Sequence, residues 1–280
     1  MQDSHEGAQR ASSRRSYRLV LVGVMASVMA VGGIVAQPAP AAAAGVKVVI
    51  VVGPVGSSTA NYIYNARKLA AQARSYGATV YELYSPHATW ARVKSVAQGA
   101  NLFIYLGHGN GYPSPYGPFS KYTKDGLGLN AADGSSRNVY YGEYYLSTYI
   151  HLARNAVVIL NRLCYASGDS EWGAANPTKA TAIKRADNFA AGFLRTGARA
   201  VFAEGINSAS SIIFGLFRTS HTMKQIFWAD PARSGRYAFS FASVRTPGKV
   251  ALMDPYAPNR YYRSVVGDLG VTGASFRIGG

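Results

Sequence analysis

"VKVVIVVGPVGSSTANYIYNARKLAAQARSYGATVYELY", residues 46–84, combines a strand pattern, a helix pattern and a second strand pattern in one run. Residues 46–52 are an almost continuous β-branched run ending at Gly53, which is typical of a strand covered on both faces. Residues 59–77 carry apolar side chains at helical spacing, with Gly77 as a stop signal. Residues 78–84 form the second strand. This order predicts a βαβ unit and a parallel sheet.

The same alternation continues along the chain, with one long interruption. The fifty residues after the third strand are rich in Gly, Pro, Asn and Ser, so we expect no regular element there until a helix toward the end of residues 139–153. The other expected elements are a helix over 89–100, strands over 102–106, 155–164 and 198–206, and helices over 182–197 and 211–230. The predicted fold class is therefore α/β, a three-layer sandwich with a mostly parallel sheet.

Three segments are expected from length and composition. The 280 residues are 48% hydrophobic and 15% charged, which suits one large globular domain with at most a small appendage. Residues 45–234 form the α/β domain. Residues 235–280 look extended, and we expect them to pack on the same domain as an edge hairpin or small cap.

Residues 1–44 resemble an export signal. Arg14, Arg15 and Arg18 precede the apolar run 19–36, and small residues follow up to a cleavage site near Ala43 or Ala44. We therefore expect a secreted, extracellular protein, in which cell-wall association is open, without a stable membrane span after cleavage. The alternative is that residues 19–36 remain as an anchor.

The predicted mature chain is strongly basic. Of 29 Lys and Arg and 13 Asp and Glu, residues 1–44 hold four Arg, one Asp and one Glu, which leaves 25 basic and 11 acidic side chains, net +14. Such a charge favours anionic partners, and an anionic cell-surface polymer is one candidate. The basic residues are scattered, without a Lys/Arg block or a known nucleic-acid motif, so we expect no nucleic-acid partner.

Two strands of the predicted sheet end close to chemically active side chains. The strand over 102–106 runs into His108, and the strand over 155–164 ends in Cys164, the only cysteine. A lone thiol in an exported protein is a buried small hydrophobe, an intermolecular link or a reactive group. Because ligands bind at the carboxyl ends of parallel strands, neighbouring strands would bring imidazole and thiol together.

A Cys-His pair supplies nucleophilic catalysis. A free thiol titrates near 8.5, so an imidazole has to accept its proton before it attacks well. Glycines beside the histidine allow backbone N–H groups to approach a developing oxyanion. We therefore predict His108 as general base, Cys164 as nucleophile, and the N–H groups of Gly109 and Cys164 as an oxyanion hole.

The two blocks "FIYLGHGNG" and "VVILNRLCYASG" resemble those of clan CD cysteine peptidases, which include caspases, legumains, gingipains and CHAT-domain proteins. The resemblance in element order spans roughly residues 46–230 and implies a caspase-like fold and endopeptidase activity on protein or peptide substrates. It supports the same roles for His108, Cys164 and Gly109. Arg162-Leu163 depart from the small residue that usually precedes the family's cysteine. The specificity residues stay open, with five unranked acidic candidates: Asp125, Asp133, Asp169, Glu171 and Glu204.

The other motifs in the sequence give weaker evidence of function than the Cys-His pair. "GPVGSST" (53–59) lacks the lysine of a phosphate loop, so we expect a helix-initiating turn. "GDS" (168–170) lacks the partner histidine of a GDS-type esterase. No zinc-ligand spacing occurs, and we expect neither metal nor cofactor. His151 is a rival base in principle, although we expect it on a helix surface.

The 20 tyrosines leave a second class of function open. They cluster at 140–149 and 256–262, where they could line a carbohydrate-stacking surface or pack under a loop. The alternative function is thus a non-catalytic relative of the peptidases or a secreted protein that binds carbohydrate or the cell wall.

Overall fold

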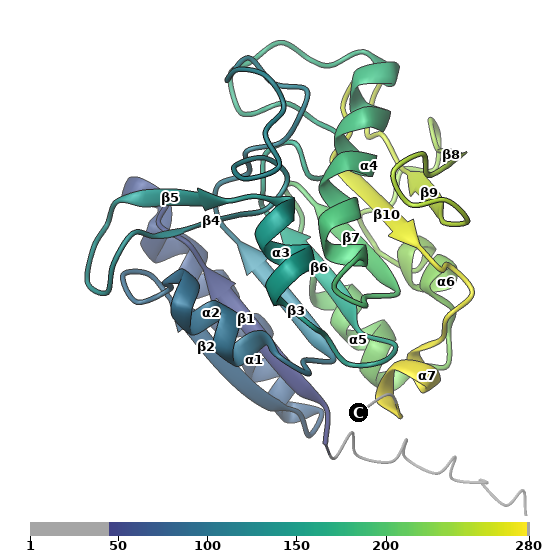
Figure 1. Ribbon diagram of the computed structural model, residues 1–280. Helices are drawn as coiled ribbons and strands as arrows, with labels where there is room; N and C mark the ends of the chain where they lie inside the picture. Colours follow the sequence, from purple (N-terminus) through teal and green to yellow (C-terminus); the bar gives the residue numbers. More distant parts are fainter. Residues whose placement is uncertain (1–44, 279–280) are drawn as a thin grey trace, which may run out of the picture. The chain divides into compact units, whose positions relative to one another are not determined.

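A computed structural model describes residues 45–278 of the protein. Its main sheet has eight strands in the order β2-β1-β3-β6-β7-β10-β9-β8 (Figure 1). The strands from β2 to β7 are mutually parallel, and β10, β9 and β8 alternate in direction beyond them. In chain order the strands of this sheet are β1 (Lys47–Val52), β2 (Thr79–Tyr84), β3 (Leu102–Leu106), β6 (Val157–Asn161), β7 (Ala200–Glu204), β8 (Phe239–Ala242), β9 (Val250–Met253) and β10 (Arg263–Gly267).

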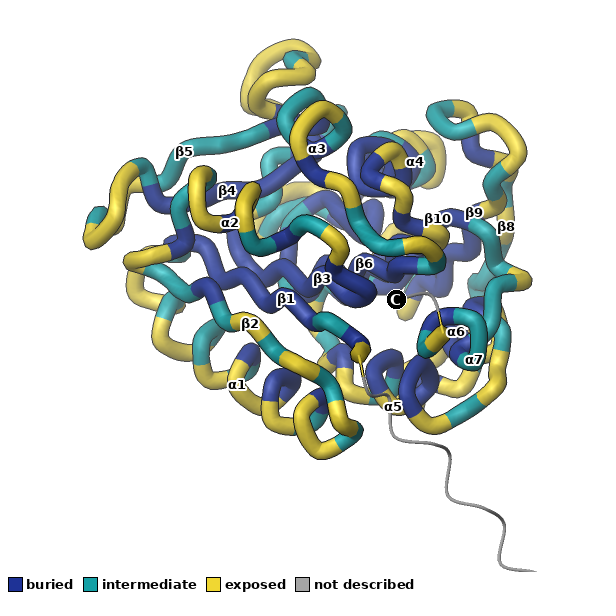
Figure 2. The backbone as a smooth tube through the Cα atoms, turned by 60° about the horizontal axis from the view of Figure 1, so that its bottom comes forward, coloured by how far each residue is buried: buried dark blue, intermediate teal, exposed yellow. Residues whose placement is uncertain are grey.

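Helices cover both faces of the sheet. One face packs on α1 (Thr59–Ser75), α5 (Ser210–Arg218), α6 (Met223–Trp228) and α7 (Gly273–Arg277). The other packs on α2 (Trp90–Ala97), α3 (Glu143–Tyr149) and α4 (Lys179–Leu194). Figure 2 shows the buried sheet between helices whose outer sides are exposed. The predicted three-layer α/β sandwich with a mostly parallel sheet is confirmed.

The burial of β1 explains its sequence. Val48 and Ile50 belong to the core under α1 and α5, whereas Val49 and Val51 belong to the core under α2 and α4. A strand buried on both faces gains about 1.5–3 kcal/mol for each large aliphatic side chain that leaves water. This gain favours an unbroken apolar run over an alternating one.

Two expectations about regular structure were wrong. The segment expected to lack regular elements contains the antiparallel hairpin of β4 (Leu127–Asn130) and β5 (Asn138–Tyr141). The helix expected within residues 139–153 is present as α3, directly after this hairpin. Its Asp133-Gly134 pair is a turn signal, and Gly134 has a φ of +77°. The helix expected over 211–230 is divided into α5 and α6, because Thr222 begins α6 with a capping box that includes Gln225.

The C-terminal segment extends the main sheet. The predicted edge hairpin is present as β8 and β9, which pair antiparallel. β10 lies further inside, between β7 and β9, and all five of its residues are buried. Residues 235–278 therefore share a continuous sheet and core with the preceding segment.

The predicted signal segment, residues 1–44, and the alternative anchor, residues 19–36, lie outside the described residues. Among residues 45–278, no helix combines the length and apolar character needed to cross a membrane. "GPVGSST" forms the predicted helix-initiating turn: the 3-10 helix η1 (Gly56–Ser58) leads into α1, and the Val55 N–H donates to Thr59 Oγ1 at 2.9 Å.

Candidate functional site

Strand pairing brings the two predicted active-site loops together. β3 and β6 are parallel neighbours, with Leu106 opposite Asn161, as the dyad required. His108 follows β3 by two residues. Cys164 does not end a strand as predicted, because β6 stops at Asn161 and a turn carries the thiol beyond it.

Gly109 lies directly against the backbone of Cys164. A β-carbon at Gly109 would lie 3.0 Å from the carbonyl carbon of Cys164 and 3.2 Å from its nitrogen, and it would overlap with the carbonyl oxygen. Only glycine permits this approach. Within residues 45–278, the Gly109 N–H donates to no other group, so it is available to a ligand at this position.

The turn that carries Cys164 has an unusual backbone. Arg162 and Tyr165 have φ angles of +61° and +68°, a region that costs a non-glycine residue about 1–3 kcal/mol. The Arg162 N–H donates to the carbonyl of Glu204 at 2.8 Å, which fixes the start of the turn to β7. Such strain persists where surrounding contacts over-determine the conformation, and it gathers at functional sites.

The loop after His108 is held by a buried lysine. Lys124 is 2% exposed, and its Nζ donates to Asn110 Oδ1 at 2.8 Å, Ser114 Oγ at 3.0 Å and the Tyr116 carbonyl at 2.9 Å. The neighbouring Asp125 accepts from the Tyr112 N–H at 3.0 Å. The loop after His108 is therefore ordered by a buried polar centre formed by Lys124 and Asp125.

Arg185 of α4 connects the His108 loop to the Cys164 loop. Its Nε donates to the Pro113 carbonyl at 2.7 Å, and its Nη1 donates to Ser170 Oγ at 3.0 Å. The guanidinium also lies over the ring of Tyr165, 4.7 Å from its centroid. Sequence reasoning missed this residue, because a basic residue in a helix is ordinarily on the solvent side.

The resting protonation states differ from a preformed ion pair. Partial desolvation lowers the pKa of the His108 imidazole, although the residue is exposed as a whole, and the charge of Glu171 acts in the opposite direction. Burial raises the pKa of the Cys164 thiol, and Glu171 raises it further, while the N–H groups of Trp172 and Cys164 itself lower it. These directions favour a neutral imidazole and a protonated thiol at neutral pH.

The five acidic candidates occupy four different environments. Asp133 is exposed and pairs with His87 at 2.9 Å, and Asp125 lies under the His108 loop. Glu204 belongs to a buried ionic cluster. Asp169 and Glu171 alone among the five line a pocket of about 250 Å³ together with Cys164.

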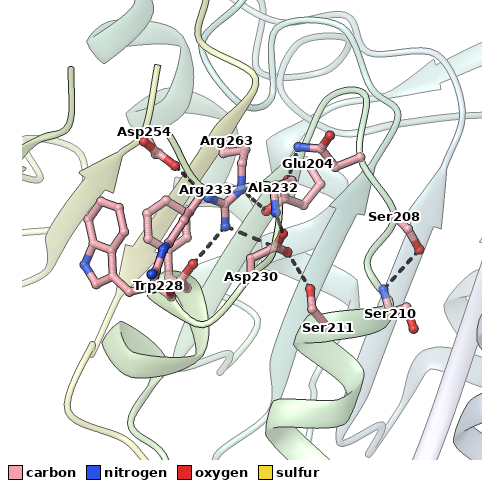
Figure 3. Close-up of polar contacts among 12 residues, drawn as sticks. Glu204, Ser208, Ser210, Ser211, Trp228, Asp230, Ala232, Arg233, Asp254 and Arg263 are labelled. Atoms are coloured by element: carbon pink, nitrogen blue, oxygen red, sulfur yellow. Dashed lines mark hydrogen bonds and ion pairs between the residues drawn. The ribbon is translucent and has the colours of Figure 1, made fainter. Parts of the chain in front are cut away.

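Figure 3 shows the buried cluster around Arg263. The Nε of Arg263 donates to both carboxylate oxygens of Glu204, at 3.0 and 3.2 Å, and the Nη1 of Arg263 donates to the Asp254 carboxylate at 2.7 Å. Asp230 lies 3.8 Å from Nη2. Burial raises the pKa of Glu204 to about 7 despite the arginine. This cluster braces β7 and β10 and does not line the pocket beside Cys164.

The remaining sequence candidates lie elsewhere. His151 is exposed, but it follows the end of α3 instead of standing on a helix surface as expected, and its carbonyl accepts the N–H of Gly99, two residues beyond the end of α2, at 2.8 Å. The described residues contain no group of three His, Cys, Asp or Glu side chains suited to a metal ion.

Comparison with protein-family models finds no match, and comparison with curated proteins finds none either.

Proposed function

We propose that the protein is a secreted cysteine endopeptidase of the clan CD type, with His108 as general base and Cys164 as nucleophile. The single observation that carries this proposal is the contact of Gly109 with the Cys164 backbone across the pair β3 and β6. It brings the residue after the histidine against the nucleophile, with an N–H free for an oxyanion.

The reaction follows from these groups. His108 takes the thiol proton as Sγ bonds to the carbonyl carbon of the scissile peptide, and the carbonyl oxygen becomes an oxyanion facing the Gly109 N–H. The tetrahedral intermediate collapses, the C–N bond breaks, and the leaving amine takes the proton from the imidazolium. Water then attacks the thioester with His108 as base, which releases the carboxylic acid and restores the thiol.

Neutral resting partners fit general-base catalysis, because the proton moves during attack and no ion pair has to exist beforehand. The backbone strain at Arg162 and Tyr165 and the polar centre at Lys124 give further support. Both features fix loop geometry near the two side chains at an energetic cost.

The test uses cleavage and labelling together. We expect wild-type protein to cleave a peptide library, and Cys164→Ala and His108→Ala to lose this activity while keeping the same thermal unfolding. A thiol-directed probe should label Cys164 in the native state. Full cleavage by the Cys164→Ala variant would overturn the proposal.

A second candidate function rests on an aromatic surface beside α2 and α3. We define this tyrosine surface as Trp90, Tyr122, Tyr141, Tyr144, Tyr145 and Tyr149, in which the centroids of neighbouring rings lie 5.0–6.4 Å apart. Lys121 lies over the rings of Tyr122 and Tyr144, and Lys94 over that of Tyr149.

Half-exposed rings with attached cations suit stacking on sugars of an anionic cell-surface polymer. The test is sedimentation with purified cell-wall polymer. We expect Tyr149→Ala with Tyr122→Ala to reduce binding and Cys164→Ala to leave it unchanged. A polymer that binds both variants equally would exclude this surface.

A further inference from the structure

The pocket beside Cys164 contains hydrogen-bond acceptors that the protein does not use. Ser167 is 1% exposed, and its Oγ has no hydrogen-bond partner within residues 45–278. Asp169 is 6% exposed and accepts one bond, from the neighbouring Ser170 N–H at 2.9 Å. No arginine or lysine nitrogen of the described chain lies within ion-pair distance of its carboxylate. The charges of Arg260 and Arg185 act on the Asp169 carboxylate from farther away and lower its pKa, although burial raises it overall. A buried carboxylate with one hydrogen bond and no close ion pair can accept further donors from a ligand.

Glu171 adds a second carboxylate to the same pocket. One of its oxygens accepts from the Tyr116 hydroxyl at 2.6 Å, which joins the loop after His108 to the loop after Cys164. The negative charge of Glu171 acts to raise the pKa of both the His108 imidazole and the Cys164 thiol. The alternate residues 167, 169 and 171 thus present one hydroxyl and two carboxylates to one pocket.

Two arginines also line the pocket, so charge alone does not decide what it binds. Arg260 is exposed and donates to the Tyr262 hydroxyl at 3.1 Å. Arg162 is half-buried, its Nε has no hydrogen-bond partner within residues 45–278, and it also lines a separate pocket under α1. Asp169 is more buried than either arginine, so its carboxylate is the charged group of this pocket that is most cut off from water, whereas the guanidinium of Arg260 is satisfied by water.

We propose that residues 167–171 form the pocket for the side chain on the acyl side of the scissile bond, that this pocket selects Lys and Arg, and that the bound cation activates Cys164 by offsetting the charge of Glu171. The inference rests on the proposed peptidase function and names its substrate class. A guanidinium or ammonium group supplies the donors that Ser167, Asp169 and Glu171 lack.

The activation step follows from electrostatics. Burial is the main cause of the raised pKa of the Cys164 thiol, and the negative charge of Glu171 is the second. A cation that pairs with Glu171 removes much of this second contribution, which favours the thiolate as attack begins. A neutral side chain in the same pocket does not offset the charge of Glu171, which continues to disfavour the thiolate of Cys164.

The specificity test uses four fluorogenic peptides that differ only at the residue before the scissile bond, with Arg, Lys, Gln or Asp there. We expect kcat/KM to be roughly 100-fold higher for Arg and Lys than for Gln. Asp169→Asn should remove most of this preference, whereas Asp133→Asn, an exposed acidic residue away from the pocket, should leave it unchanged. A preference for Asp would assign the pocket to Arg162 and Arg260 and overturn the proposal, as would equal rates.

The activation test does not depend on cleavage. The rate of Cys164 alkylation by neutral iodoacetamide is measured against pH, and its midpoint reports the pKa of the thiol, which simple blocking of the pocket does not shift. Agmatine should lower this midpoint, and the neutral citrulline amide should not. Glu171→Gln should lower it without any ligand. An unchanged midpoint with agmatine and in the variant would overturn the activation step.

The two tests separate this inference from the proposed function. If no peptide is cleaved but agmatine still shifts the alkylation midpoint, the cation pocket stands and the peptidase proposal fails. If peptides are cleaved without a basic preference, the peptidase stands and the pocket assignment fails.

Discussion

Gly109 and Cys164 touch through their backbones, so the distance between the two predicted catalytic loops is set by the absence of one side chain. A β-carbon at residue 109 would overlap with the Cys164 carbonyl oxygen. That oxygen also accepts the Ala166 N–H at 2.9 Å inside the turn. Any displacement of the carbonyl therefore changes the turn that carries the thiol.

The first prediction concerns this contact. Gly109→Ala should push the two loops apart, destabilise the protein by about 1–3 kcal/mol and reduce peptide cleavage more than tenfold. Gly270→Ala is the matched control, because no atom lies within 4 Å of a β-carbon there. Urea unfolding and kcat/KM measure the two effects. Normal cleavage by Gly109→Ala would show that the loops can separate without loss.

The second prediction concerns Arg185. Arg185→Lys keeps the charge but cannot make both bonds of the guanidinium, to Pro113 and Ser170, so we expect a loss of about 1–3 kcal/mol in unfolding free energy. As a positioning residue it should lower kcat more than it raises KM. Lys184→Ala, on the exposed side of α4, should change stability by less than about 0.5 kcal/mol. If both variants changed the unfolding free energy and kcat equally, the role of Arg185 in connecting the His108 loop to the Cys164 loop would be contradicted.

Local patterns predicted most of the sheet because they depend only on burial and period. The strands β1, β2, β3, β6 and β7 all agree with the predicted ones, because β1, β3, β6 and β7 are mainly apolar runs and β2 directly follows the helix pattern of α1. The hairpin of β4 and β5 was missed because each strand has four residues and β4 contains a glycine, which leaves no run long enough to stand out.

The dyad candidates could also be predicted, because the carboxyl ends of neighbouring parallel strands meet at one edge. The ranking of the acidic residues could not. Asp133 and Asp169 look alike in sequence, and only the path of the loop after β6 buries Asp169 beside the thiol. Arg263 was equally hidden, because its three carboxylate neighbours come from separate segments.

The third prediction concerns pH and Asp125. Burial raises its pKa to about 8, far above the ordinary value, so the folded protein holds a proton there that the unfolded chain releases near pH 4. The folded state is therefore favoured at low pH, and this contribution is lost as pH rises toward 8, by at most about 1.4 kcal/mol per pH unit. Asp125→Asn, which cannot ionise, should flatten this decline in urea unfolding. An unchanged pH profile would show that Asp125 is ionised in the folded state.

The fourth prediction concerns the cluster of Figure 3. Arg263→Met removes the cation and leaves the buried carboxylates of Glu204 and Asp254 with hydrogen-bond donors but no neutralising charge, which should cost about 3–5 kcal/mol near pH 8. Glu204 already has a raised pKa of about 7, so it takes a proton as pH falls, and the cost should shrink near pH 5.

Removing Arg263 should also change the environment of the Cys164 thiol, because the Glu204 carbonyl accepts the Arg162 N–H at the start of the Cys164 turn. We therefore expect Arg263→Met to change the alkylation rate of Cys164 at a pH where the variant remains folded. Arg233→Met, an exposed arginine whose Nη1 donates to the Trp228 carbonyl, is the control and should change neither property. A destabilisation that is independent of pH would mean that Glu204 keeps its charge without Arg263, and an unchanged alkylation rate would mean that the Cys164 turn holds its shape without the cluster.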